Sequence, residues 1–330
     1  MMPEEPRPED EDATCARAIL TMLAAGGSIP GLSRPAYTLH APAEPLVPVL
    51  IAVPHAGRAY APGLLQRMRH AEDTPRRLED RFVDVLAREV AMRCGAALLL
   101  AQAPRAMIDL NRDPRDFDLG MFSGSDDEKA AMRRGMPRGG AQSARAMRGL
   151  GLFPRRLSGI GELWRGPMRP VEALHRIAAV HAPYHDALAA QIAAIREQWG
   201  AALLVDFHSM PDLPHGGGAD GPATHVLGDR FGGSCGRDVL AAGLAGLAAA
   251  GVQSAYNRPY AGGYALERHG APRDNIHAVQ IEIARSLYLD KALDRPGIGV
   301  ARQAAIMAQV VLAMADIVGA AGAAWPQAAE

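Results

Sequence analysis

Two histidines and an aspartate have the side chains that a hydrolytic metal site requires. His55 closes the apolar run 49–54, and His208 closes a second run, 202–207. With a carboxylate such as Asp80, they form the ligand set of zinc sites that leave a fourth position open for water. Both runs are typical of buried strands in an α/β protein, where ligands bind outside the carboxyl ends of the strands. The two imidazoles are therefore expected to meet at one edge of a sheet.

The carboxylates around these histidines have competing interpretations. Asp80 and Asp84 both fall in a predicted helix, where an acidic residue near the start also interacts favourably with the helix dipole. Spacing alone leaves both open as the metal ligand. Asp206 precedes His208 by two positions, so the two side chains share one face of a strand. Asp206 is predicted to hold the site by a hydrogen bond; a strand-end cap is the alternative.

Glu282 is the candidate general base. It lies in the apolar run 278–284, where Gln280 and Glu282 face away from the intervening apolar side chains. A carboxylate in such a strand is costly to bury without a partner. Strongly perturbed carboxylates concentrate in active sites, which favours catalysis over the alternative of a salt bridge to Arg285 or another arginine.

Anion-binding candidates follow the predicted strand 105–110. Arg112 emerges beside Asn111 at the expected carboxyl edge, and arginine binds carboxylates bidentately. Asp109 has the pattern of a half-buried residue and is predicted to hold an arginine in place. These charges could also be ordinary surface groups.

A glycine-rich loop over 257–264 supplies further candidates. Gly262 and Gly263 allow the backbone to approach a ligand closely, and Arg268 follows soon after. The histidines of the long predicted helix are interpreted as packing or surface residues; they are His175, His181 and His185.

Short apolar runs alternate with helical patterns, which indicates a mostly parallel sheet. The fold class is therefore α/β, a single domain with a mixed, mainly parallel sheet flanked by helices. The expected strands are 47–53, 96–101, 105–110, 201–207, 224–227 and 278–284. The expected helices are 78–94, 171–199 (kinked or divided at Pro183), 236–250 and 299–319.

Composition bounds the remaining possibilities. The 330 residues suffice for a sizeable core, and 35 Lys+Arg against 36 Asp+Glu give no argument for nucleic acid or an acidic membrane. Three distant cysteines make a disulfide framework improbable. We expect no membrane span, a disordered acidic tail over 1–12, and a cytoplasmic protein whose catalytic domain covers 13–330. The irregular basic segment 121–150 is predicted to be a loop or lid. Nothing in the composition predicts the oligomeric state.

The chain resembles the N-formylglutamate amidohydrolase family in motifs spread from about 47 to 290. The motifs are VPHAG (53–57), the ED of 79–80, PRAMIDLNRD (104–113), GLFP (151–154), PYHDAL (183–188), DFHS (206–209), GGSC (232–235), PYAGGY (259–264), ERHG (267–270) and HAVQIEIA (277–284). The resemblance implies a fold similar to zinc carboxypeptidases and aspartoacylase.

It also implies one Zn²⁺ per chain, held by His55, Asp80 and His208, with Glu282 as base and acid. The implied reaction converts N-formyl-L-glutamate and water to formate and L-glutamate. Two alternatives remain. One is hydrolysis of another N-acyl amino acid or small linear amide by the same chemistry. The other is a non-catalytic carboxylate-binding protein, which would need neither an open metal nor a base.

Overall fold

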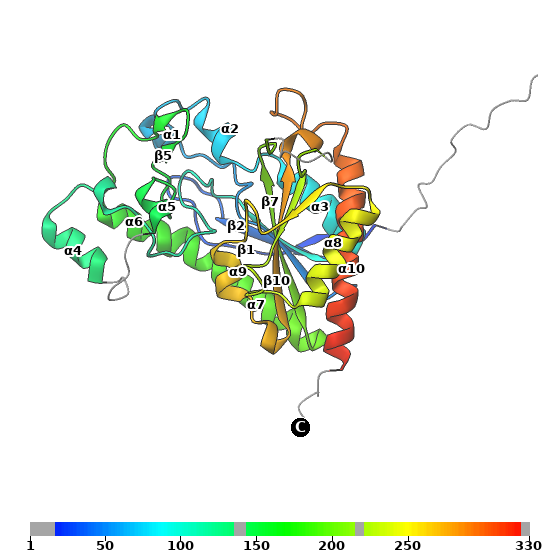
Figure 1. The fold of residues 1–330 in the computed structure, drawn as a ribbon. Coiled ribbons are helices and arrows are strands. Elements are labelled where there is room, and N and C mark those ends of the chain that lie inside the picture. Colours follow the sequence, from blue (N-terminus) through cyan, green and yellow to red (C-terminus); the bar gives the residue numbers. More distant parts are fainter. Residues whose placement is uncertain (1–16, 135–142, 215–220, 325–330) are drawn as a thin grey trace, which may run out of the picture.

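An eight-stranded sheet forms the centre of the computed structural model, which describes residues 17–134, 143–214 and 221–324 (Figure 1). The order across the sheet is β1-β2-β4-β3-β7-β10-β8-β9. The strands are β1 (Thr21–Gly26), β2 (Tyr37–Ala41), β3 (Val49–Val53), β4 (Ala97–Ala101), β7 (Ala202–Met210), β8 (His225–Gly228), β9 (Ser254–Tyr256) and β10 (Ile276–Ala284). The central strands β4, β3, β7 and β10 are parallel, whereas β2 and β8 run antiparallel to their inner neighbours. The prediction of a mixed, mainly parallel sheet is confirmed.

Helices cover both faces of this sheet (Figure 1). The α-helices are α1 (Pro62–Arg67), α2 (Thr74–Leu78), α3 (Val83–Cys94), α4 (Asp126–Arg134), α5 (Ala144–Met147), α6 (Pro170–Arg176), α7 (Ala182–Trp199), α8 (Arg237–Ala249), α9 (Tyr264–His269) and α10 (Val300–Ala323). Shorter elements are the helical turns η1 (Leu119–Met121), η2 (Ile177–His181), η3 (Pro272–Asp274) and η4 (Arg285–Leu287), and a small hairpin of β5 (Arg156–Leu157) and β6 (Gly161–Glu162).

Each central strand contributes to two apolar layers, because successive side chains point to opposite faces. On β3, Val49, Ile51 and Val53 pack with α3, α8 and α10, whereas Leu50 and Ala52 pack on the α7 side. A continuous apolar run is therefore what a strand covered on both faces requires. Only its carboxyl end is free to present polar residues.

Two predicted elements differ from the structure. Residues 105–110 form a turn-rich segment and not a strand, because Asp109 turns inward and accepts the backbone N–H of Asn111. The helix predicted over 78–94 begins only at Val83, because Phe82 has a left-handed backbone (φ 56°) that a right-handed helix does not tolerate. The helix predicted over 171–199 is interrupted by the π-helical turn η2, which ends two residues before Pro183, so the predicted division near this proline is confirmed.

The segment 121–150 is less irregular than expected, since it contains α4 and α5. Its role as a lid stays a prediction. The acidic tail predicted over 1–12 lies outside the described residues. Three strands of the eight-stranded sheet were not predicted, namely β1, β2 and β9, and neither was the small hairpin of β5 and β6.

α10 corrects the expectation that no segment resembles a membrane span. By length and composition alone this helix could cross a membrane, with a mean hydropathy of 1.9. However, half of its most apolar window is buried, and Met307, Val311 and Met314 belong to the core beside the sheet. A core helix passes the same test, so the packing accounts for this composition.

Candidate active site

Strand register assembles a polar layer on one face of the sheet. β7 and β10 are parallel, and their pairing sets Asp206 beside Gln280 and His208 beside Glu282. The face opposite carries Phe207 and Ile281, which belong to the apolar core. One polar residue at every second position in two neighbouring strands thus gives a compact polar site.

His55 enters this site from the end of β3. It lies two residues beyond Val53, and its backbone carbonyl accepts the N–H of Asp80 at 3.0 Å. Asp80 is therefore part of the loop between α2 and α3 and not of a helix. Gly57, two residues beyond His55, allows the segment after β3 to pass close to the segment after β4, because a Cβ there would lie 2.1 Å from the carbonyl oxygen of Ala103.

His55, Asp80 and His208 form a group that could hold a metal ion. One ligand atom from each lies within 4.8 Å of the others, and all three side chains are buried. Both Nδ1 atoms face the same carboxylate oxygen, Oδ2 of Asp80, at 3.6 Å for His55 and 2.9 Å for His208. Tetrahedral zinc with bonds of about 2.1 Å places its ligand atoms about 3.4 Å apart. These side chains therefore fit the ion, with small adjustments.

The opposite ring nitrogens are held by two further carboxylates. Nε2 of His55 lies 2.8 Å from Asp109, and Nε2 of His208 lies 2.9 Å from Asp206. Metal-binding histidines usually donate their other N–H in this way, which fixes the tautomer and orients the ring. The predicted supporting roles of Asp109 and Asp206 are compatible with this geometry.

The charges around the group favour a cation. Burial opposes ionisation, but hydrogen bonds with both histidines hold the pKa of Asp80 well below its usual range. Burial also lowers the pKa of His208, but Asp206 and Asp80 outweigh this effect and raise the pKa well above its ordinary value. A site that stabilises a positive imidazole between two carboxylates also suits a divalent metal.

The structure separates the two aspartates that spacing could not. Asp84 lies in the first turn of α3 and forms a two-pronged ion pair with Arg58, with both contacts at 2.8 Å. It is not part of the group of potential metal ligands found among the described residues.

We expect Asp80→Asn to lower metal affinity far more than Asp84→Asn does, because only Asp80 presents an oxygen to both imidazoles. Metal content of the purified variants, measured after dialysis against a graded chelator series, checks this expectation. Asp84→Asn is the matched control, since it removes one charge from the same loop–helix unit. An equal loss in both variants would contradict the assignment of Asp80.

Glu282 lines the same cavity and lacks the salt bridge considered as its alternative role. Its Oε1 accepts a hydrogen bond from Gln280 at 2.9 Å, and no described residue forms an ion pair with it. Arg285, the suggested partner, instead contacts Asp80 at 3.3 Å. Burial, reinforced by Asp80, raises the pKa of Glu282 to about 8. Such a carboxyl group takes up and releases a proton readily near neutral pH.

Asn111 connects the site to the glycine-rich loop. Its amide donates to Asp206 at 3.0 Å and to Gln280 at 3.3 Å, and its oxygen accepts the N–H of Ala265. A Cβ on Gly263 would lie 2.5 Å from that oxygen, so this close approach requires glycine. Gly262 also lines the cavity, with a φ of 107°. The substrate contacts predicted for these residues stay predictions.

A cavity of about 350 Å³ opens over these groups and is rich in arginine. Arg112 lines it, with Nε donating to the carbonyl of Leu150 at 3.0 Å. Arg268 does not line it; this exposed residue of α9 contacts the hydroxyl of Tyr264 and Asp186. Four lining arginines were not predicted, namely Arg77, Arg105, Arg145 and Arg285.

Arg105 and Arg145 show why these arginines escaped the sequence analysis. Arg105 is held by Asp109 at 2.9 Å, as expected for an unspecified arginine, but its position depends on the turn 105–110 that was predicted as a strand. Arg145 belongs to α5, which Ser143 fixes by bonding Asp116. Only the folded chain reveals that these side chains point to the same cavity.

Two histidines interpreted as packing residues support the Arg112 segment. Nε2 of His185 lies 2.8 Å from the carbonyl oxygen of Leu110, and Nε2 of His181 lies 2.9 Å from that of Arg112. His269 is stacked on His185, with a contact of 3.0 Å. Burial lowers the pKa of His185 to about 2, so it stays neutral and can accept from His269. His175 is exposed on α6.

Comparison with known proteins identifies the family. The model of the N-formylglutamate amidohydrolase family matches residues 47–289. This chain belongs to that family. The N-formylglutamate deformylase of Pseudomonas aeruginosa is 31% identical over 254 residues, which cover 74% of this chain and 83% of that protein. The deformylase of Pseudomonas putida is also 31% identical, over 252 residues and the same shares. The chain is therefore an amidohydrolase enzyme.

Solved structures agree. The crystal structure of N-formylglutamate amidohydrolase from Ralstonia eutropha superposes with a TM-score of 0.74 at 27% identity, covering 86% of this chain and 98% of the other. A protein of Agrobacterium tumefaciens has the same fold, with a TM-score of 0.59 at 19% identity over 86% and 96% of the two chains.

Proposed function

We propose that this amidohydrolase hydrolyses N-formyl-L-glutamate to formate and L-glutamate, with a zinc ion held by His55, Asp80 and His208. The main support is that a buried group with zinc-ligand chemistry and the carboxyl group of Glu282 line one arginine-rich cavity. The deformylase names of its relatives support the choice of substrate. A small soluble substrate and a cytoplasmic location accompany this proposal.

The bound metal would polarise the formyl carbonyl and increase the acidity of water. Glu282 accepts a proton from the attacking water as oxygen bonds to the formyl carbon. It then donates that proton to the glutamate nitrogen as the C–N bond breaks, so formate and the free amine leave. A pKa raised by burial suits a group that must both accept and release one proton.

The cavity arginines would orient the substrate. Arg112 is assigned to a glutamate carboxylate, because it lines the cavity and its Nε contact with Leu150 fixes its direction. Asn111, the residue before Arg112, anchors this part of the chain, because its side chain bonds both Asp206 and the backbone N–H of Ala265. Arg145, contributed by α5, lies on the same lining and is available for the second carboxylate.

Arg112→Ala is expected to raise KM for N-formyl-L-glutamate by about tenfold or more, with a much smaller change in kcat, as expected when binding common to ground and transition states is lost. Steady-state kinetics with N-formyl-L-glutamine extends the test, because its side chain lacks the charge. The wild type should strongly prefer N-formyl-L-glutamate over the amide, and the variant should do so weakly.

Arg268→Ala is the control, since that arginine does not line the cavity. Unchanged discrimination in Arg112→Ala would assign the side-chain carboxylate to another arginine, with Arg145 next to test. If the wild-type enzyme hydrolysed N-acetyl-L-glutamate but not N-formyl-L-glutamate, the proposed substrate would be wrong. The proposed mechanism of amide hydrolysis would still apply.

A further inference from the structure

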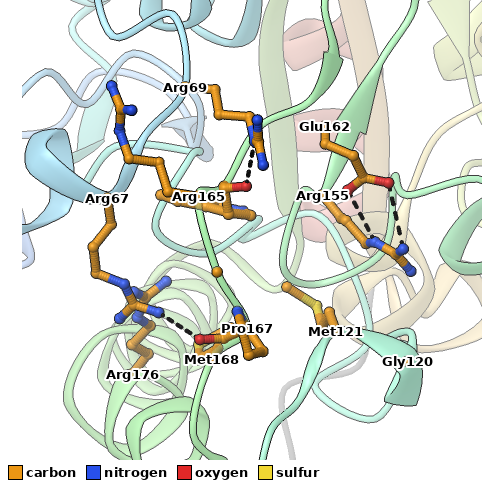
Figure 2. Close-up of a pocket in the computed structure, with 12 residues that line it drawn as sticks. Arg67, Arg69, Gly120, Met121, Arg155, Glu162, Arg165, Pro167, Met168 and Arg176 are labelled. Carbon is orange, nitrogen blue, oxygen red and sulfur yellow. Dashed lines mark hydrogen bonds and ion pairs between the residues drawn. The ribbon is translucent and has the colours of Figure 1, made fainter.

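A second cavity of about 280 Å³ lies apart from the catalytic one (Figure 2). It is formed by the end of α1, the turn η1, the β5–β6 hairpin and the segment that leads into α6. The described residues that line it include none that line the catalytic cavity. Figure 1 shows these elements together on the side of the molecule away from α10.

Positive charge is concentrated here. The lining and adjoining arginines are Arg67, Arg69, Arg155, Arg156, Arg165 and Arg176, and the carboxylates that contact them are Asp118, Glu162 and Glu172. Six arginines thus face three carboxylates, which leaves an excess of three positive charges. The whole chain has a formal charge of −1, so this excess is local.

Two of these arginines have terminal N–H groups that are free to bind a ligand. Arg69 donates from Nε to the carbonyl of Trp164 at 2.8 Å, and Arg165 donates from Nε to the carbonyl of Met68 at 3.1 Å. Neither forms an ion pair with a carboxylate in the part of the chain that the structure describes. Their Nε contacts fix the direction of each guanidinium while its terminal nitrogens remain available for a carboxylate or phosphate.

The wall of the cavity is partly apolar. Met121, Pro167 and Met168 lie between the Arg67–Arg176 side and the Arg155–Glu162 pair in Figure 2. Trp164 completes this wall, and its indole N–H donates to the carbonyl of Pro154 at 2.7 Å. The cavity can therefore contact both the charged groups and the carbon skeleton of a ligand, and its size suits a small metabolite.

We propose that this cavity is a second binding site, for a small anion that carries several carboxylate or phosphate groups on a carbon skeleton. Arg69 and Arg165 would bind its charged groups. Arg67 and Arg176, which both form ion pairs with Glu172, would supply additional positive charge. Trp164 and the methionines would pack on the carbon atoms. The proposal rests on this cavity alone and is independent of the substrate proposed above.

The test is titration calorimetry of the full chain with citrate and with fructose 1,6-bisphosphate, and fructose as the uncharged control. We expect binding of at least one anion and none of fructose. The double variant Arg69→Gln/Arg165→Gln should weaken binding by about tenfold or more, a loss of about 1.4 kcal/mol or more. Both side chains are exposed, so folding should survive; thermal melting checks this.

Two controls locate the binding. Arg302→Gln removes an exposed charge from α10, across the sheet, and should leave the affinity unchanged. Arg145→Gln alters the catalytic cavity only and should also leave it unchanged. Affinity unchanged in the double variant, loss of binding in Arg145→Gln, or failure of both anions to bind would each overturn the proposal. The anion that binds more tightly reveals whether the site prefers carboxylate or phosphate.

Discussion

Glu282→Gln is expected to lower kcat by about 10²- to 10⁴-fold, the usual contribution of general acid–base catalysis. The substitution keeps the shape of the side chain and can still pair with Gln280. It cannot carry a proton from water to the leaving nitrogen. Because Glu282 is not one of the three potential metal ligands, metal content should equal that of the wild type. KM should change little.

Steady-state kinetics and metal analysis on the same preparation separate this result from misfolding or metal loss. Glu267→Gln is the control, because Glu267 is an exposed carboxylate on the neighbouring helix α9 and does not line the cavity. Near-normal kcat in Glu282→Gln would remove Glu282 from the proton transfers. Loss of metal in that variant would show that Glu282 supports the ion and not the reaction.

The positions of His55, His208 and Glu282 could be predicted because each follows or interrupts an apolar strand. A strand buried on both faces has no tolerance for an ionisable side chain without a partner. Such residues are therefore easy to recognise in the sequence. Because the carboxyl ends of parallel strands lie at the same edge of the sheet, residues there are expected to lie close together. The structure brings all three to one cavity.

Asp80 could not be chosen over Asp84 from the pattern, because the decision depends on two non-helical features. The left-handed Phe82 ends any helix that would join α2 to α3, and the backbone bond from Asp80 to His55 turns the carboxylate inward. The resemblance to the family selected Asp80 through its motif, whereas helical periodicity allowed both aspartates. Asp84 is instead engaged by Arg58.

The arginines were the least predictable part of the site. Arginine is common on protein surfaces, and its long side chain reaches a cavity only when several loops are in place. Arg268 was a further candidate after Arg112 in the sequence, but in the structure it contacts Asp186 from α9. Arg285 was considered only as a partner of Glu282, whereas η4 brings it to Asp80.

The missed strands have a similar cause. Among the described strands, β1 is an exposed edge strand that pairs only with β2, and a bulge between Met22 and Ala24 breaks its alternation. Periodicity predicts a strand through burial, so an edge strand without a buried face leaves no signal. The parallel strands of the centre, in contrast, were all predicted except for their exact ends.

His208→Ala is expected to remove bound metal and activity together. The imidazole presents Nδ1 to Asp80 at 2.9 Å and is held from behind by Asp206 at 2.9 Å. Alanine removes one of the three ligands that the structure offers, and it leaves Asp80 and Asp206 without the imidazole that contacts both of them. Metal content should fall from about one ion per chain to a small fraction, and turnover should fall in parallel.

His225→Ala is the matched control for this variant. His225 is also a buried histidine in a strand of the same sheet, but it bonds Gln303 at 3.1 Å and does not line the cavity. Both variants lose a buried ring and should be destabilised to a similar extent, whereas only His208→Ala should lose metal. Metal analysis with thermal melting compares the two. Full metal occupancy in His208→Ala would exclude this histidine as a ligand, and metal loss in both variants would show that the ion depends on the general integrity of the sheet.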